Sequence, residues 1–354
     1  MAKQAKSRNN RCDFRIGVIS DHDKKSWNIM KNKTIAKLSA VALSIGLLYI
    51  LLSRVQFDEI VTTLTSINPA YILAGFALYI CSYFLRAFRF YILLHREIEL
   101  KDLFNIICVH NMVNNILPAR TGELSYIYLL KKVHKKTTGE GVASLMVARI
   151  FDIIALSLLF LISVLIVKDL PEIFMNTIGT VALFMVIMLI YLIVLLYSGR
   201  SFFGITKRFF GKYNLDQRKP GNYLLKIGEE TVDSLEKTNI GNGIYLLILS
   251  SILIWLLNYS MVFFLLQGMT IHIPLQNVIL GATFCLLTTV LPIQGVGGFG
   301  TSETVWTLVF VPLGMSLEAA IISGFSYHII LIMYYLFIGS YGLIALKATV
   351  RTTQ

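Results

Sequence analysis

The sequence of 354 residues is poor in charge, because Asp, Glu, Lys and Arg make up only 15% of it, against about 25% in a typical soluble domain. Between Lys237 and Glu303 none of these four residue types occurs. A helix that crosses a bilayer needs about 20 apolar residues, so this charge-free stretch is long enough for more than one. With a hydrophobic content of 56% and a mean hydropathy of +0.69, the composition excludes an ordinary soluble protein and predicts an integral membrane protein.

The sequence also lacks the motifs that hold metals, disulfides or ATP. The cysteines Cys12, Cys81, Cys108 and Cys285 are scattered and form no Cys-x-x-Cys pair, so we expect neither a zinc site nor a disulfide framework. No Walker-type phosphate loop is present, and that motif is the usual sign of direct ATP use. We therefore expect no metal and no cofactor.

The net charge of +12 lies in short segments between apolar runs. Ten Lys or Arg occur between Lys3 and Lys37, four Lys between Lys131 and Lys136, and more from Arg200 to Lys226. This distribution follows the positive-inside rule of membrane proteins and does not favour nucleic acid as a partner. It predicts a multi-pass protein of the cytoplasmic membrane, with both termini on the cytoplasmic side.

Long apolar runs predict an all-α, polytopic fold with six full spans. The spans are expected at about 35–53, 70–94, 142–167, 174–198, 243–267 and 319–346. Residues 1–34 are expected to form a basic, disordered cytoplasmic tail and residues 347–354 a short cytoplasmic tail. The membrane domain is then 35–346, with a cytoplasmic loop at 200–240.

Two further apolar stretches, Leu103 to Leu130 and Gln276 to Val311, are each interrupted by proline and glycine. Proline ends a helix, each half is short for a span, and the topology requires each stretch to return to its starting side. We therefore expect two re-entrant helical hairpins. The order of span, amphipathic link, span, hairpin and span then occurs twice, in opposite senses across the membrane, which predicts the inverted repeat of many secondary transporters.

The second interruption contains Gly295, Gly297 and Gly300 in the spacing G-x-G-x-x-G. A dinucleotide site needs a strand before this motif, whereas here a charge-free, membrane-length run precedes it, so we reject a nucleotide site. Irregular backbone at membrane depth occurs only inside protein or against a cavity. With Gly298 in the turn and Glu303 in the first turn of the next helix, the free N–H groups there predict an anion site. The alternative is a plain tight turn between packed helices.

The first interruption has similar parts. Asn114 and Asn115 precede Pro118, and Arg120 and Glu123 follow it. The planar guanidinium of Arg120 is suited to bind a phosphate with two parallel hydrogen bonds. The alternative is that it pairs with a carboxylate.

Other ionisable residues lie within the predicted spans, where charge is costly and usually faces the bundle interior. Arg149 and Asp152 are three residues apart and share a helical face, so they either pair with each other or complete a polar cavity. His328 lies at the corresponding place in the last span, as a second polar group near the midplane or as a structural histidine. Arg86 and Arg89 lie among aromatic residues at the inner end of the second span, as interfacial anchors or as head-group contacts.

Four motifs occur in order: LRAFRF (85–90), NNILPARTGE (114–123), RIFD (149–152) and LPIQGVGGFGTSE (291–303). Together they resemble the family named for the transmembrane region of lysylphosphatidylglycerol synthase, also called flippase-like integral membrane proteins of the AglD-type group. The resemblance covers residues 35–346 and implies a module that moves lipids or lipid-linked head groups between leaflets. It further implies that residues of the two hairpins line the route, namely Asn115, Pro118, Arg120, Gly122, Glu123, Gly297, Gly298, Gly300 and Glu303, and that Arg149 and Asp152 form the family's Arg-x-x-Asp.

The sequence departs from the family pattern in two places. Ala148 stands where relatives often have Glu, and His328 stands where relatives often have Arg. The catalytic domain that follows the membrane part in the lysyl transferases is also expected to be absent.

The leading hypothesis is a flippase or transporter for an anionic phospholipid or a polyprenyl-phosphate-linked lipid. A membrane-embedded transferase, with Glu123 and Glu303 as a carboxylate pair, is one alternative, and the sequence does not decide the question although it favours a transporter. An accessory subunit of cell-envelope lipid or glycan synthesis is the other. The expected partners are membrane lipids, and a homo-oligomer or a complex with envelope-synthesis enzymes stays open.

Overall fold

The computed structural model describes residues 46–117, 122–167, 172–213, 215, 217, 219–237, 244–288 and 298–352, and the regular elements over these residues are helices. Residues 46–52 are helical, but most of the first predicted span and the predicted N-terminal tail lie outside the described residues, as do Pro118, Arg120 and Gly297. The helices that follow are α2 (Phe57–Ser66), α3 (Pro69–Leu93), α4 (Leu100–Ile116), α5 (Glu123–His134), α6 (Thr138–Ile166), α7 (Glu172–Lys212), α8 (Lys219–Lys237), α9 (Ile244–Gly268), α10 (Leu275–Thr288), α11 (Thr301–Phe310) and α12 (Leu317–Thr352).

Four of these helices, α3, α6, α9 and α12, are long and apolar enough to cross a membrane. They coincide with four of the six predicted spans, so an all-α, polytopic membrane protein is confirmed. The region predicted as the fourth span lies in α7, whose described apolar section is the shorter Ile178–Ile190. Non-helical dihedral angles at Ser198 (φ −113°, ψ 16°) mark a kink in α7.

Local sequence explains where the long helices begin. The Asn68 side chain accepts a hydrogen bond from the Ala70 N–H, and Pro69 occupies the first helical position of α3, where its missing N–H costs nothing. At the start of α6, Thr137 and Glu140 satisfy each other's backbone N–H groups in a capping box. Such caps satisfy donors that the helix itself leaves free.

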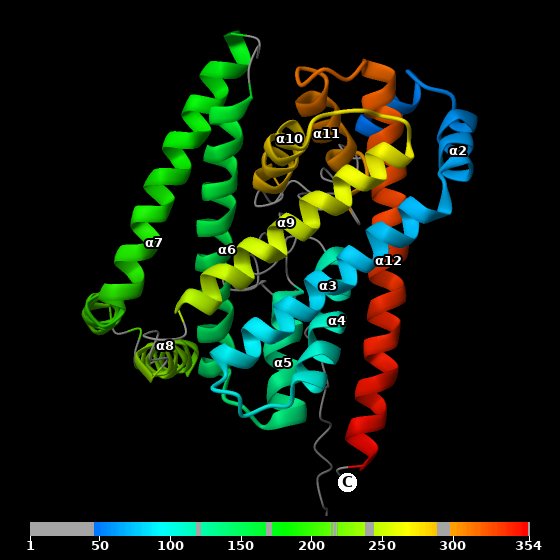
Figure 1. Ribbon diagram of the computed structural model, residues 1–354. Coiled ribbons are helices and arrows are strands. Elements are labelled where there is room, and N and C mark those ends of the chain that lie inside the picture. The colour runs from blue at the N-terminus through cyan, green and yellow to red at the C-terminus, as the bar shows by residue number, and fades with distance from the viewer. Residues whose placement is uncertain are drawn as a thin grey trace, which may run out of the picture.

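Two antiparallel pairs of short helices lie at opposite ends of the molecule (Figure 1). The pair α4 and α5 lies at the lower end in that view, and the pair α10 and α11 at the upper end. The longest of the four, α4, has 17 residues, which at 1.5 Å per residue is about 26 Å, short of the roughly 30 Å hydrocarbon core. Each of these four helices is therefore shorter than a full span.

The packing of the helices is regular. The helix α3 lies along α9 through the centre, α4 packs on α12, and α10 packs on α6. The short helix α2 contacts α12, and α8 contacts α6. The two short pairs are thus held by the two long helices α6 and α12.

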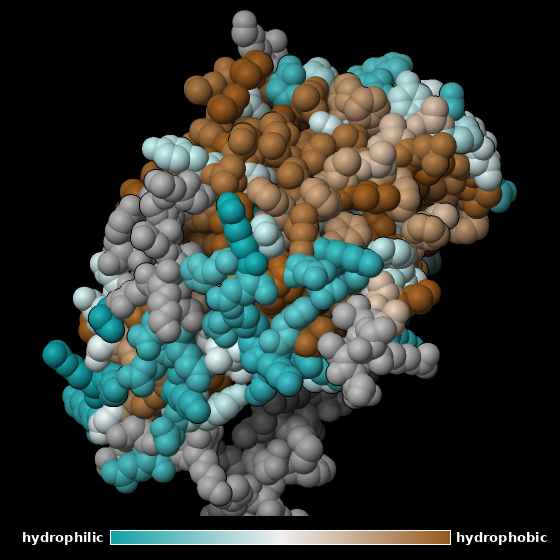
Figure 2. Space-filling model, turned by 60° about the horizontal axis from the view of Figure 1, so that its bottom comes forward, coloured by the Kyte–Doolittle hydropathy of each residue, from teal (hydrophilic) through white to brown (hydrophobic). Residues whose placement is uncertain are grey.

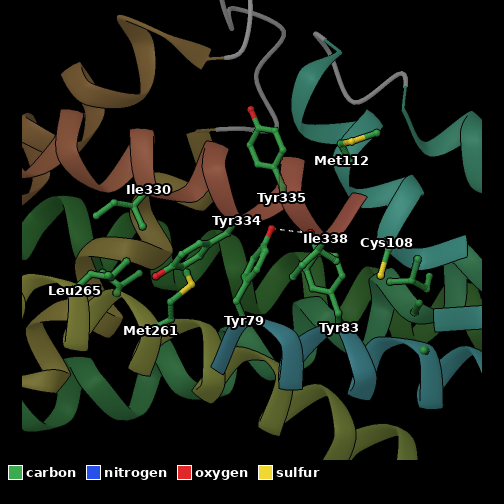
Figure 3. Close-up of a cluster of buried hydrophobic side chains, with 14 of the residues drawn as sticks. Tyr79, Tyr83, Cys108, Met112, Met261, Leu265, Ile330, Tyr334, Tyr335 and Ile338 are labelled. Carbon is green, nitrogen blue, oxygen red and sulfur yellow. Dashed lines mark hydrogen bonds between the residues drawn. The ribbon is translucent and has the colours of Figure 1, made fainter. Parts of the chain in front are cut away.

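The core between α3, α4, α9 and α12 is a cluster of aromatic and aliphatic side chains (Figure 3). Tyr79 and Tyr83 are buried there with their hydroxyl groups 2.6 Å apart. Glycine permits the close contact of α4 with α12, because a Cβ at Gly342 would lie 2.7 Å from the Cys108 Cβ and 2.8 Å from the Asn105 carbonyl oxygen. Small residues at helix contacts of this kind are typical of membrane proteins.

Hydrophilic residues gather on one end of the molecule, while the flanks are mainly hydrophobic (Figure 2). That end includes the C-terminus of α5, with Lys131 and Lys132 exposed. There Lys136 forms ion pairs with Glu97 and Glu140, which join the α5–α6 link to the α3–α4 link. Hydrophobic flanks and a polar end are the surface expected of a protein that lies in a bilayer with this end in water.

The contact of α4 with α12 gives a test of the fold. We expect Gly342→Val to destabilise the protein by about 1–3 kcal/mol, because the new side chain meets backbone that cannot move aside. The matched control is Gly179→Ala in α7, where an added Cβ meets nothing within 4 Å and stability should not fall. Thermal unfolding of the purified proteins in detergent measures both, and equal melting temperatures for the two variants would contradict the packing described.

Candidate functional site

A buried ion pair joins α3 to α6, and two hydrogen bonds to the same pair add α9. The guanidinium of Arg89 in α3 donates to both oxygens of Asp152 in α6, at 2.6 and 3.1 Å, and the two side chains are only 2% and 4% exposed. Arg89 also donates to the Ser251 hydroxyl at 2.9 Å, and the Trp255 indole N–H donates to Asp152 at 3.0 Å, both from α9. This cluster fixes α3, α6 and α9 relative to one another.

The buried position of Arg89 differs from its expected place at the membrane interface. The side chain is neither an interfacial anchor nor open to a head group, because it is buried and its guanidinium group donates to Asp152 inside the bundle. The sequence analysis also missed Ser251 and Trp255. Their spacing of four residues in a charge-free span places both on one helical face, and that was the available signal.

Arg86 lies one turn before Arg89 on α3 and has a different environment. Its guanidinium lies over the Trp255 ring, 5.7 Å from the centroid, and it is close enough to Asp152, Arg89 and Arg149 to interact with them electrostatically. Among the described residues, however, no carboxylate lies within ion-pair distance of Arg86. Within the described ranges, Arg86 is therefore a half-buried cation that has no carboxylate of its own.

At the first break, between α4 and α5, Glu123 accepts a hydrogen bond from Arg149 at 2.7 Å. Arg149 lies 3.8 Å from Asp152, so its closer partner is Glu123 and the closer partner of Asp152 is Arg89. The side chains of Arg149 and Glu123 are 33% and 34% exposed. The expected pair of Arg149 and Asp152 is thus present only as the longer of two contacts.

Gly122, directly before α5, is packed tightly against α4. A Cβ at Gly122 would lie 2.3 Å from the Asn114 Cα, so glycine is required by close approach of backbone. Asn115 donates its side-chain amide to the Asn111 carbonyl at 2.9 Å, whereas the Asn114 side-chain oxygen is buried and accepts no hydrogen bond from any described residue. Of these two residues, Asn114 is the one whose side-chain oxygen has no hydrogen-bond partner within the described part of the chain.

At the second break, between α10 and α11, Glu303 is 1% exposed. One of its oxygens accepts the Gly300 N–H at 2.7 Å, and the other accepts from the His328 Nδ1 at 2.5 Å. The Phe299 ring stacks on the imidazole with centroids 4.5 Å apart. Gly298 and Gly300 have φ of +80°, the left-handed region that favours glycine.

The two breaks share one arrangement. In each, a carboxylate in the first turn after the break binds a basic group on the next long helix, as Glu123 binds Arg149 and Glu303 binds His328. Among the described residues, no hydrogen bond or ion pair joins the group at the first break to the group at the second. The described ranges also hold no group of three His, Cys, Asp or Glu residues suited to a metal ion.

The Arg89–Asp152 pair gives the first prediction for the site. Arg89→Met should cost about 3–5 kcal/mol of stability, because it leaves a buried carboxylate without its partner. The matched variant Arg86→Met, one turn away, should cost only about 0.5–1 kcal/mol, the size of a cation–π contact. Thermal unfolding in detergent compares them. The double variant Arg89→Met/Asp152→Leu should regain much of the loss, and equal costs at positions 86 and 89 would contradict the assignment.

The second break gives another prediction. Glu303→Ala removes the acceptor for the buried Gly300 N–H and for His328, so it should cost about 1–3 kcal/mol. Glu303→Gln keeps an acceptor and adds a donor, which the other tautomer of His328 can accept, so its stability should stay near that of the native protein. Glu318→Ala, in the first turn of α12, is the control. A loss in Glu303→Gln as large as that in Glu303→Ala would show that charge, rather than hydrogen bonding, holds this break.

The sequence is similar to that of known membrane proteins. Residues 37–339 match the family described as the lysylphosphatidylglycerol synthase TM region. Among curated proteins, the chain is similar to the UPF0104 membrane protein MJ1595 of Methanocaldococcus jannaschii, with 27% identity over 289 residues that cover 77% of this chain and 84% of that protein. No solved structure matches. Because the match extends over most of the chain, this multi-pass membrane protein belongs to the lysylphosphatidylglycerol synthase TM region family.

Proposed function

We propose that this protein is a flippase that moves an anionic lipid, either a phospholipid or a polyprenyl-phosphate-linked lipid, between the leaflets of the cytoplasmic membrane. The observation on which the proposal depends is the two pairs of short helices at opposite ends of the molecule, α4–α5 and α10–α11 (Figure 1). In each pair, a carboxylate in the first turn of the second helix binds a basic group on the next long helix. Broken helices at the midplane are where many secondary transporters bind their substrates.

The order of the helices supports an inverted repeat. The elements α2 to α6 occur again as α8 to α12: an amphipathic helix, a long helix, a broken pair and a long helix. The packing is reciprocal as well, since α4 lies on α12 and α10 on α6, while α2 contacts α12 and α8 contacts α6. The central contact of α3 with α9 then contains the pseudo-two-fold axis.

The charges supply the proposed orientation. The end that carries the basic links and the C-terminus of α5 is the cytoplasmic side by the positive-inside rule. The pair α4–α5 then enters the membrane from the cytoplasm, the pair α10–α11 enters from outside, and the remaining helices are six full spans with both termini in the cytoplasm.

The charge balance at the first break favours an anionic head group. Arg86, Arg89 and Arg149 lie together with only two carboxylates, Asp152 and Glu123. One cation is therefore in excess among the described residues, and a phosphate would balance it. Arg86 is the guanidinium without a carboxylate, and Arg120, which the sequence places in the break itself, is a second phosphate ligand in this proposal.

A carboxylate pair for catalysis is less well supported. Glu123 and Glu303 each have a basic partner of their own at separate breaks, and a general acid or base must reach the same reacting atoms as its counterpart. We therefore favour transport without a chemical change in the lipid.

Leaflet exchange in proteoliposomes tests this proposal. Purified protein is reconstituted with a fluorescent anionic phospholipid, a zwitterionic phospholipid or a labelled polyprenyl phosphate, and an impermeant quencher reports which leaflet holds the label. We expect exchange of at least one anionic lipid, lowered about tenfold or more in Arg86→Ala and Arg120→Ala by loss of a charge-assisted contact. Lys131→Ala, an exposed cation at the polar end, should leave exchange unchanged.

Three outcomes would count against the proposal. The first is an absence of exchange for all these lipids, with and without a proton gradient. The second is equal loss in Lys131→Ala and Arg86→Ala. The third is a covalent change in the lipid, detected by mass spectrometry, which would favour the transferase.

A further inference from the structure

A groove opens on the side of the molecule between α5 and α6. Its volume is about 280 Å³. Its walls are the apolar side chains of Leu124, Ile127, Val142, Leu145, Met146 and Ile150, and it also contacts Glu123 and Arg149. Because α5 and α6 are antiparallel, with Glu123 bonded to Arg149 and Ile127 against Gly141, the ion pair lies at the inner end of the groove and the apolar walls extend from it toward the polar end of the molecule.

The groove is open to the surface along α6, a candidate membrane span, and yet a charged pair lies at one end of it. Leu124 is 68% exposed, so the groove is open on the flank of the bundle, where α6 is a candidate membrane span. At its inner end, Arg149 and Glu123 are about one-third exposed. A charged pair in contact with hydrocarbon is costly, so this end of the groove requires a polar occupant, while the walls require an apolar one.

We propose that this groove is the side entrance for the transported lipid, in which a hydrocarbon tail lies along Leu124, Ile127 and Met146 while the phosphate binds Arg149. The inference rests on the proposed function and names the place where head group and tail separate. An arginine has five N–H donors, so Arg149 keeps donors for a phosphate while one nitrogen stays bonded to Glu123. A membrane lipid supplies both parts, because its anionic head group is joined directly to a hydrocarbon tail.

The corresponding place in the second half is closed. The Glu303 side chain is fully buried, the His328 side chain is 12% exposed, and the Trp306 and Tyr327 rings stack between α11 and α12 with centroids 5.0 Å apart. Over the residues that the structure describes, the α5–α6 side is therefore open laterally and the α11–α12 side is closed. A head group that crosses the midplane with its tails in hydrocarbon needs such an opening.

Photo-crosslinking locates the tail without any need for transport. The full-length protein is reconstituted with phosphatidic acid that carries a diazirine on its acyl chain, and the labelled residues are identified by mass spectrometry. We expect labelling at Leu124, Ile127 and Met146 that is retained when unlabelled phosphatidylcholine is added in excess and is displaced by excess unlabelled phosphatidic acid. Leu158 and Ile162, exposed on the same helix α6, should be labelled without this preference.

Two variants test the chemistry of the groove. Arg149→Gln should lower the labelling of the groove about tenfold, as expected for loss of one charge-assisted contact, and leave labelling at Leu158 unchanged. Met146→Trp fills the groove and should lower both its labelling and exchange, whereas Leu158→Trp on the lipid-facing side of α6 should lower neither. Thermal unfolding checks that each variant is folded.

The outcomes separate the inference from the proposed function. Groove labelling with the expected head-group preference, but no exchange in the native protein, would retain the groove as a lipid site and reject transport. Exchange in the native protein that persists in Met146→Trp would reject the groove as the entrance and retain transport. Equal labelling of the groove and of Leu158, insensitive to Arg149→Gln, would overturn the inference.

Discussion

The buried ion pair of Arg89 with Asp152 is the constraint on which the rest of the structure depends. Hydrocarbon offers no water to an unpaired charge, so α3 and α6 are stable only in the arrangement that brings these two side chains together. Ser251 and Trp255 add two hydrogen bonds from α9, which connect this third long helix to the pair. Because the pair occupies both oxygens of Asp152, the neighbouring cations must find other partners. Arg149 does so at Glu123, which places the start of α5 beside α6 and forms one wall of the lateral groove.

The two halves of the molecule use the same geometry with different chemistry. At the first break an arginine, charged at every physiological pH, holds its carboxylate while both side chains stay partly exposed. At the second break a histidine holds a carboxylate that is fully buried. The first arrangement retains charge at an open site, whereas the second is compact, since stacked rings and glycine turns surround it. The two places therefore differ both in exposure and in the basic group that binds the carboxylate, which is arginine at the open one and histidine at the closed one.

The sequence alone predicted those features that depend on local composition. The four candidate spans in α3, α6, α9 and α12 follow from apolar length, whereas most of the proline and glycine residues that predicted the two breaks lie outside the described residues. The pairing of charges was not predicted, because it depends on contacts between distant segments. Spacing along one helix favoured Arg149 as the partner of Asp152, yet Arg89, 63 residues away, is closer. Helical spacing reports which side chains share a face, but it does not report which neighbouring helix lies against that face.

Arg86 and Arg89 have different partners among the described residues, although they lie on the same helix. Both lie on α3 within one turn, and both are close to Asp152. A carboxylate accommodates one bidentate guanidinium, and Arg89 takes that place. The guanidinium of Arg86 instead lies above the Trp255 ring, and this contact contributes far less stability than a buried ion pair. A bundle that only needed stability would replace such a residue by an apolar one at little cost. In the function proposed above, the charge of Arg86 is instead balanced by an anion from outside the chain, the phosphate of a lipid.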